Sequence, residues 1–495
     1  MAEPRPPRPP REQRFERRMS DAEALMWNVE KDPWLNPNGG TLVILDRAPD
    51  FEHFRAQWAA TVATVPRLRE RVVQGLGRFQ PPVWRPDPEF DLDYHIRQVA
   101  LPAPGSQRQL LDMVAAIYQD PYDRTRPLWM FHLIDGLENG GSALVWKIHH
   151  AVADGIGAGR LAESYLQPTR RPPAAQEVDL DAIIAAAVAA DAEEHGQQSV
   201  TSSVVGTLSH AVRRQSGITR RAMGELAMWG ADPLRARDTV EGVVRTVQQA
   251  RKQLLGGGQK VEGEADSGVP GGSPLWRQRS RHRHLEILSF SLEDALKSAK
   301  GLGGSLNDWF VTGVVNGAIG YHDERGVPLS SLNTSFVVST RTDKAIGGNA
   351  FTPSRLSVPA GPMDPAERFR EISGRMSSNR SEVSGQGMMA GLAGVANLLP
   401  TSLVTGVARS QAARMDFATS NLRGAKVPLY ISGALVEGNY PFGPLAGTAF
   451  NITTMSYNGA LGMGLFIDPV AVEDPTGLRS HVEAAYDELI AAGSG

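Results

Sequence analysis

The sequence of 495 residues contains no cysteine. This absence excludes disulfide bonds, thiolate metal ligands and a cysteine nucleophile. The sequence also lacks an excess of one charge, because 51 Lys and Arg residues face 54 Asp and Glu residues, for a formal net charge of -3. The charge balance therefore gives no reason to expect a nucleic acid as a partner. Any chemistry must depend on other side chains.

The N-terminus lacks the apolar stretch that a secretory signal requires, so we expect a cytoplasmic protein. Residues 1–18, MAEPRPPRPPREQRFERR, are rich in Pro and Arg, which predicts a disordered arm. A tail that docks on a membrane is the alternative.

Long apolar runs are scarce as well. Residues 383–408 carry no charge and are long enough to span a bilayer, but their glycines, Asn397 and Pro400 disfavour a spanning helix. We expect buried or interfacial helices there. Peripheral contact with a membrane or a lipid droplet stays open.

The length exceeds the roughly 250 to 300 residues of a usual single core, so two domains are expected. Helical and strand patterns recur in both halves without regular βαβ spacing, which predicts an α/β fold with two sandwich-like domains. We expect a first domain at 19–170 and a second at 279–495. Between them, 171–278 reads as a helical connection with a Gly-rich flexible loop.

Apolar periodicity predicts the elements of the first domain. We expect strands at 41–46, 129–137 and 142–150, and helices at 18–30, 51–73 and 108–119. The segment FDLDYHI, 90–96, offers a metal-binding Asp-x-Asp pattern, but its alternation favours a strand. In the second half, Asn458 and Gly459 predict a type I′ hairpin, because both residues tolerate positive φ.

Two adjacent histidines, His149 and His150, end the apolar run SALVWKIHH in a chain with only 11 histidines. A strand end places a side chain at the rim of a sheet, and histidine can take a proton near neutral pH. Successive strand residues point to opposite faces, so one histidine is expected to be a general base and the other structural. Gly155 allows a tight turn behind them.

Three alternatives compete with the general base. Two histidines on opposite faces chelate a metal poorly, and the HExxH spacing is missing. A Ser-His-Asp hydrolase would need a G-x-S-x-G elbow, which we do not find. The third alternative is a pair of satisfied core histidines beside a turn aspartate, Asp154.

The segment HHAVADG, 149–155, matches the HHxxxDG motif of the chloramphenicol acetyltransferase-like acyltransferases, which include peptide condensation domains and plant BAHD acyltransferases. RPLWMFHLIDGL, with Pro127, Leu128 and Trp129, resembles the PLW segment of the bacterial wax ester synthase/diacylglycerol acyltransferase family. Three later segments resemble that family in the same order: SLNDWFVTGV, GGNAFTPSRLSVP and SYNGALGMGLFIDPVAVEDP. The resemblance covers 19–478. TSNLRGAKVPLYISGA, 419–434, departs from the family's Asn-Val-Pro-Gly-Pro loop, and loops near a tunnel mouth usually set acceptor or acyl specificity.

The resemblance implies two chloramphenicol acetyltransferase-like sandwich domains with an active-site tunnel at their interface. It implies an O-acyltransferase that moves a fatty acyl group from acyl-CoA to a long-chain alcohol or diacylglycerol, giving wax ester or triacylglycerol. Acyl-CoA is then a substrate, and neither a cofactor nor a metal is expected. Two alternatives are an acyltransferase of the same fold with a carrier-protein donor and a catalytically silent member that binds lipid.

Within such a reaction, particular residues have expected roles. We expect direct transfer with His150 as the general base and His149 in a supporting, structural role. Asp154 is expected in a structural ion pair, with Arg341 as its candidate partner. Asn307 is a candidate for contact with the substrate or the oxyanion. Asp308 is either catalytic or part of a helix capping box that begins at Ser305.

Overall fold

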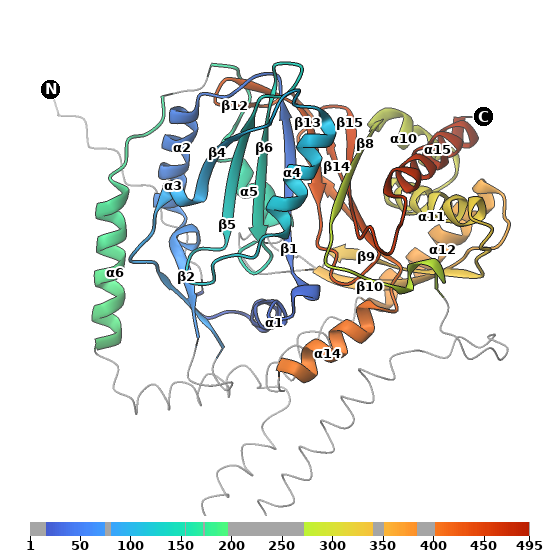
Figure 1. Cartoon of the computed structure of the whole chain (residues 1–495), viewed down its shortest axis with the longest axis horizontal. Helices are drawn as coiled ribbons and strands as arrows, with labels where there is room; N and C mark the ends of the chain where they lie inside the picture. Colours follow the sequence, from blue (N-terminus) through green and yellow to red (C-terminus); the bar gives the residue numbers. More distant parts are fainter. Residues whose placement is uncertain are drawn as a thin grey trace, which may run out of the picture.

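Two β-sheets lie side by side in the computed structural model, and helices cover their outer faces (Figure 1). The structure describes residues 16–74, 81–153, 155–171, 174–196, 272–339, 351–383 and 401–494. Helices and strands alternate irregularly along the chain, as the sequence predicts.

The first sheet has seven strands in the order β4-β5-β6-β1-β13-β12-β7. All neighbouring strands in it run antiparallel except β4 and β5, which are parallel. Its strands are β1 (Asn38–Leu45), β4 (Ile96–Ala100), β5 (Trp129–Asp135), β6 (Ser142–His149), β7 (Leu166–Gln167), β12 (Tyr430–Ile431) and β13 (Ala434–Phe442).

The second sheet has six strands in the order β10-β9-β11-β14-β15-β8. Strand β11 runs parallel to both of its neighbours, and the other pairs are antiparallel. Its strands are β8 (His284–Ser291), β9 (Ser331–Ser339), β10 (Phe351–Pro359), β11 (Phe417–Arg423), β14 (Phe450–Tyr457) and β15 (Ala460–Ile467); a separate hairpin pairs β2 (Glu70–Val73) with β3 (Val83–Pro86).

The helices divide between the two sheets (Figure 1). In the N-terminal half they are α1 (Asp21–Val29), α2 (Phe51–Thr64), α3 (Leu92–His95), α4 (Gln107–Gln119), α5 (Gly155–Ala162) and α6 (Leu180–Gly196), with the 3₁₀ turns η1 (Pro33–Leu35) and η2 (Pro66–Arg69). In the C-terminal half they are η3 (Leu275–Arg277), α10 (Leu292–Gly301), α11 (Leu306–Glu324), α12 (Pro365–Val383), α14 (Thr401–Ala412) and α15 (Pro475–Ser494).

Local chemistry explains several element ends. Ser20, Ser106 and Ser305 each form a capping box with the residue three positions later, which satisfies free N–H groups in the first helical turn. The hairpin expected at Asn458 and Gly459 is confirmed, since both have positive φ between β14 and β15.

Two expectations about local structure are wrong. The helix expected over 51–73 ends at Thr64, because Pro66 follows and cannot continue it; η2 and β2 take up the remaining residues. The strand expected over 90–96 is instead the short helix α3, with Asp91 as its N-cap. Asp93 pairs with Arg55 at 2.6 Å, so the Asp-x-Asp pattern serves a helix start and an ion pair.

Three apolar clusters hold the structure together. One packs α2 and the aromatic side chains Trp58, Trp129 and Trp146 on one face of the first sheet. A second places α4 on the opposite face, against Phe442 and Phe466 from the C-terminal half. The third lies between the second sheet and helices α10, α11 and α15.

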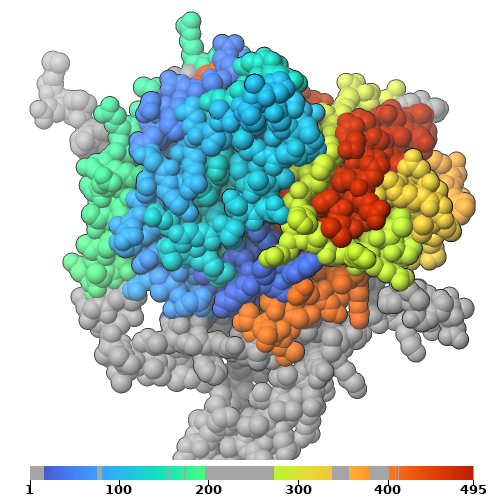
Figure 2. Space-filling model, viewed as in Figure 1, coloured from blue at the N-terminus to red at the C-terminus, as the bar shows by residue number. Residues whose placement is uncertain are grey.

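The two halves of the chain interlock. Strand β13, from the C-terminal half, pairs with β1 along Gly40 to Leu45 and so stands in the middle of the first sheet. Helix α14 lies beneath α1 and η1, where Figure 2 shows it against the N-terminal segment. Among the described residues, no helix is long and apolar enough to cross a membrane. Most of 383–408 lies outside the described residues, and α14 begins at Thr401 within it.

Candidate active site

His150 directly follows the last residue of β6, at the rim of the first sheet. Its backbone N–H faces the carbonyl oxygen of Pro37 at 3.4 Å. Its imidazole lies beside Gly39 of β1, where a Cβ atom would come within 3.1 Å of Nε2 and 3.5 Å of the Phe442 carbonyl oxygen. The side chain is partly exposed. A glycine at position 39 thus leaves room for the His150 ring.

His149 is fully buried. Its Nδ1 accepts a hydrogen bond from the backbone N–H of Ala151 at 2.9 Å, and its Nε2 lies 3.4 Å from a carboxylate oxygen of Glu30. The rings of Trp27 and Tyr122 contact it edge-on, with centroids 6.4 and 6.3 Å away. The structure therefore separates the two imidazoles, as strand geometry predicts: one lies in the core and one at the rim.

A largely buried charged cluster lies beside His149. Glu30 accepts a hydrogen bond from Arg124 at 2.9 Å, and the Arg124 guanidinium lies 3.4 Å from the centroid of the Trp27 ring. Burial raises the pKa of Glu30, but His149, Arg124 and Lys147 together outweigh it, so the net pKa lies below its ordinary value. The carboxylate is therefore charged at neutral pH.

Lys147, two residues before His149 in β6, is 2% exposed. Its Nζ donates to the carbonyl oxygens of Ile117 and Asp120 at the end of α4, and it lies over the Tyr122 ring. Burial lowers the pKa of Lys147 to about 8. Sequence analysis missed Glu30, Arg124 and Lys147. A charged residue inside the otherwise apolar run SALVWKI was the available signal.

The segment Pro127, Leu128 and Trp129 is buried beside the histidines. The Leu128 carbonyl accepts the His149 backbone N–H at 3.0 Å, and Trp129 lies opposite Ile148 in the sheet. The Trp129 indole N–H donates to the Leu68 carbonyl at 2.8 Å. The PLW segment thus fixes the end of β6 from the neighbouring strand.

Asp154 and Arg341 both lie outside the described residues, so their expected ion pair stays a prediction. Gly155 is the first residue of α5, and a helical turn replaces the tight turn expected there.

Asn307 and Asp308 lie at the start of α11, in the C-terminal half. Asp308 is buried, and its Oδ2 accepts hydrogen bonds from the Ser305 N–H at 2.8 Å, the Ser305 hydroxyl at 2.7 Å and the Ser373 hydroxyl at 3.3 Å. This is the capping role. Asn307 is partly exposed, and its Oδ1 accepts a hydrogen bond from Asn421 Nδ2 at 3.4 Å.

The Asn307–Asn421 contact joins two segments singled out in the sequence. Asn421 belongs to β11, within the segment that departs from the family loop. The described site residues thus form two groups: the histidines with the PLW segment at the end of β6, and the Asn307 group at the start of α11.

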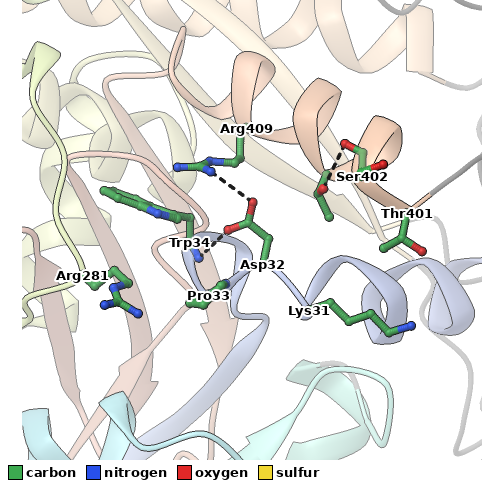
Figure 3. Close-up of a pocket in the computed structure, with 9 residues that line it drawn as sticks. Lys31, Asp32, Pro33, Trp34, Arg281, Thr401, Ser402 and Arg409 are labelled. Atoms are coloured by element: carbon green, nitrogen blue, oxygen red, sulfur yellow. Dashed lines mark hydrogen bonds and ion pairs between the residues drawn. The ribbon is translucent and has the colours of Figure 1, made fainter.

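A cleft of about 440 Å³ lies where the two halves of the chain meet. Both halves contribute: one side is formed by residues 31–34 at and before η1, and the other by Arg281 and the start of α14 (Figure 3). Arg409 of α14 pairs with Asp32 at 3.5 Å and lies 5.1 Å from the Trp34 ring centroid. Among the residues that the structure describes, no group of three or more His, Asp or Glu could hold a metal ion.

Comparison with known families identifies two regions. Residues 19–310 match the wax ester synthase/diacylglycerol acyltransferase catalytic domain, and residues 347–490 match the WS/DGAT C-terminal domain. One Mycobacterium tuberculosis protein, provisionally named a diacylglycerol O-acyltransferase, is 29% identical over 483 residues, covering 97% of this chain and 93% of that protein. Another with the same provisional name is 30% identical over 419 residues, covering 82% and 83%.

Solved structures show the same fold. A wax ester synthase/diacylglycerol acyltransferase from Marinobacter aquaeolei VT8 superposes with a TM-score of 0.61 at 21% identity, covering 97% of this chain and all of that one. The first condensation domain of the CDA synthetase superposes with a TM-score of 0.51 at 16% identity, covering 96% and 97%. These similarities confirm the expected chloramphenicol acetyltransferase-like fold with two domains.

Proposed function

The chain belongs to the wax ester synthase/diacylglycerol acyltransferase family, and we propose on this basis that it transfers a fatty acyl group from acyl-CoA to a long-chain alcohol or diacylglycerol. The products are then wax ester or triacylglycerol. Two alternatives are acyl transfer from a carrier-protein donor and lipid binding without catalysis.

One observation carries the proposal: the second histidine of the HHxxxDG motif stands at the rim of the sheet with its ring beside a glycine. His150 is partly exposed, whereas His149 is enclosed by Glu30, Trp27 and Tyr122. A general base must reach the proton that it removes, and of the two imidazoles only the partly exposed one is open to a substrate. His150 is therefore the proposed base.

The proposed reaction is direct transfer. His150 takes the proton from the acceptor hydroxyl as the oxygen attacks the thioester carbonyl. When the tetrahedral intermediate collapses, the C–S bond breaks and the imidazolium returns the proton to the departing CoA thiolate. No acyl-enzyme forms in this scheme, and the absence of cysteine removes one class of nucleophile for such an intermediate.

Neighbouring residues hold His150 in position. His149 and the PLW segment hold the last residues of β6, so the His150 backbone has little freedom to move. Asn307 is a candidate donor to the oxyanion, supported by the partly exposed position of its side chain at a helix start. Asp308 Oδ2 accepts the capping hydrogen bonds, and the proposal gives this residue no part in the transfer.

The test measures thiol release and identifies the ester product by mass spectrometry. Palmitoyl-CoA is the donor, and hexadecanol or dioleoylglycerol is the acceptor. In His150→Ala we expect kcat to fall by a factor of about 10² to 10⁴, the usual contribution of a general base. His282→Ala, at an exposed histidine, is the matched control and should keep wild-type turnover.

The other outcomes decide between the alternatives. Equal rates in wild type and a folded His150→Ala variant would show that His150 is not the base. If ester forms only with palmitoyl carrier protein, the donor is a carrier protein and not acyl-CoA. Lipid binding without turnover from either donor, unchanged in His150→Ala, would identify a silent lipid-binding member.

A further inference from the structure

The cleft between the two halves carries an excess of positive charge. Three cationic side chains, Lys31, Arg281 and Arg409, line it with a single carboxylate, Asp32. Arg409 pairs with that carboxylate. Within the described part of the chain, neither Lys31 nor Arg281 has a carboxylate partner. Two positive charges thus remain without compensation in a concave site.

The remaining lining adds hydrogen-bond donors and one aromatic face. Thr401, Ser402 and Thr405 come from the first turns of α14, where hydroxyl groups and the helix terminus favour an anion. Trp34 is partly exposed. Figure 3 shows Arg281 and Lys31 on opposite sides of the segment that carries Asp32 and Trp34. Cationic side chains and hydroxyl groups bind the phosphates of nucleotides, and an indole offers an aromatic face beside them.

The cleft lies close to the proposed base along a short stretch of chain. Trp34 is three residues before Pro37, whose carbonyl oxygen faces the His150 N–H at 3.4 Å. Three residues span at most about 11 Å even when fully extended. A ligand held in the cleft by one end can therefore present its other end near the imidazole, provided that it has a flexible arm.

We propose that this cleft binds the phosphate-bearing nucleotide end of the acyl-CoA donor. The inference rests on the proposed function, because it assigns the cleft to the donor of that reaction. A CoA molecule has phosphates at one end, a thioester at the other and a flexible pantetheine arm between them. The phosphates would lie in the cationic cleft, and the pantetheine arm would extend from there so that the thioester lies near His150.

The first experiment measures binding without turnover. Calorimetry on the full chain compares CoA, 3′-dephospho-CoA and pantetheine, with wild type and an Arg281→Gln/Arg409→Gln double variant. We expect CoA affinity to fall tenfold or more in the variant, and wild type to bind 3′-dephospho-CoA more weakly than CoA. Pantetheine binding should not differ between the proteins. Arg370→Gln, at an exposed arginine of α12, is the matched control.

A kinetic arm separates donor binding from chemistry. In the double variant the KM for palmitoyl-CoA should rise about tenfold while kcat changes less than twofold. S-Palmitoyl pantetheine, which has no phosphate, should give the same kcat/KM in both proteins. Lys31→Gln should give a smaller effect of the same kind. Equal CoA affinity in wild type and the folded double variant would overturn the assignment.

Phosphate could also come from an anionic lipid, and vesicles distinguish the two sources. Co-sedimentation with phosphatidylglycerol and with phosphatidylcholine vesicles is compared for the same proteins. If the double variant loses binding to the anionic vesicles but keeps CoA affinity, the cleft serves a lipid headgroup and the proposal is wrong. If wild type binds CoA through these arginines but forms no ester, the cleft assignment holds and the proposed reaction fails.

Discussion

His149 and Glu30 form a directed contact in the core. The Ala151 N–H donates to His149 Nδ1, so Nδ1 carries no proton and the proton of the neutral ring lies on Nε2, which faces the Glu30 carboxylate at 3.4 Å. The first histidine of the motif thus has a fixed tautomer and a fixed ring orientation.

Replacing Glu30 with Gln should destabilise the protein, because the partly exposed Arg124 would lose its carboxylate partner and the buried Lys147 would lose a nearby negative charge. Breaking a fully buried ion pair costs about 3 to 5 kcal/mol of unfolding free energy, and the partial exposure of Arg124 reduces the expected loss here to about 1 to 3 kcal/mol. Urea unfolding at pH 7 measures this loss, with Glu483→Gln, at an ion pair on the surface of α15, as the control. A loss below about 1 kcal/mol would contradict the structural importance of the cluster.

The same variant should change the response to acid. The net pKa of Glu30 in the folded state lies below its ordinary value of 4.5, so its stabilisation is present above pH 4.5 and is lost as pH falls through the folded pKa. Wild type should therefore lose more unfolding free energy than Glu30→Gln below pH 4.5. Parallel curves in that range would contradict the depressed pKa.

Gly39→Ala should impair turnover more than folding. The new Cβ would lie 3.1 Å from His150 Nε2, so the imidazole must shift by a few tenths of an ångström. Displacing a proton-transfer group on this scale should lower kcat by about 10- to 100-fold.

Gly40→Ala is the contrasting variant at the next position. There the new Cβ would collide with the Trp146 carbonyl oxygen and the Tyr118 hydroxyl, so the fold itself should suffer. Thermal unfolding and kcat are compared for both variants. Unchanged kcat in folded Gly39→Ala would show that the ring position beside β1 is not important for turnover.

His95 should make stability fall in mild acid. Its ring is fully buried and stacks on Trp129 at 4.5 Å, and burial lowers its pKa to about 4. Between pH 6.5 and 4 the unfolded chain binds a proton that the folded chain does not, so stability falls as pH falls, by up to about 3 kcal/mol. His95→Gln should flatten this part of the curve. The exposed His282→Gln variant should follow wild type, and a wild-type slope in His95→Gln would contradict the prediction.

Asp308→Ala should lower stability without removing catalysis. The variant loses the carboxylate that accepts from Ser305 and Ser373, at a cost of about 1 to 3 kcal/mol. Turnover well below the melting temperature should stay within threefold of wild type. A hundredfold loss of kcat in the folded variant would show that Asp308 takes part in catalysis.

Sequence patterns predicted those parts of the site that local rules determine. The apolar run before the histidines predicts β6, and strand alternation separates His149 from His150. The Ser305 capping pattern and the Asn458–Gly459 turn depend on neighbours within a few residues, so the sequence also predicted them.

The parts that sequence analysis missed depend on distant contacts. Glu30 and Arg124 reach His149 only after α1 and the segment before β5 have packed on β6. The alternation at 90–96 favoured a strand, but Asp91 capping and the Asp93–Arg55 pair stabilise a helical turn. The cationic cleft combines side chains from both halves, and no local pattern relates Lys31 to Arg409.

The position of β13 has a consequence for synthesis of the protein. Strand β1 ends at Leu45, but its partner β13 starts only at Ala434. At translation rates of about 5 to 20 residues per second, roughly 20 to 80 s separate the emergence of these two strands. During that interval one edge of β1 has no partner strand and could pair with another nascent chain. A chaperone that shields this edge until β13 leaves the ribosome should therefore raise the yield of folded protein.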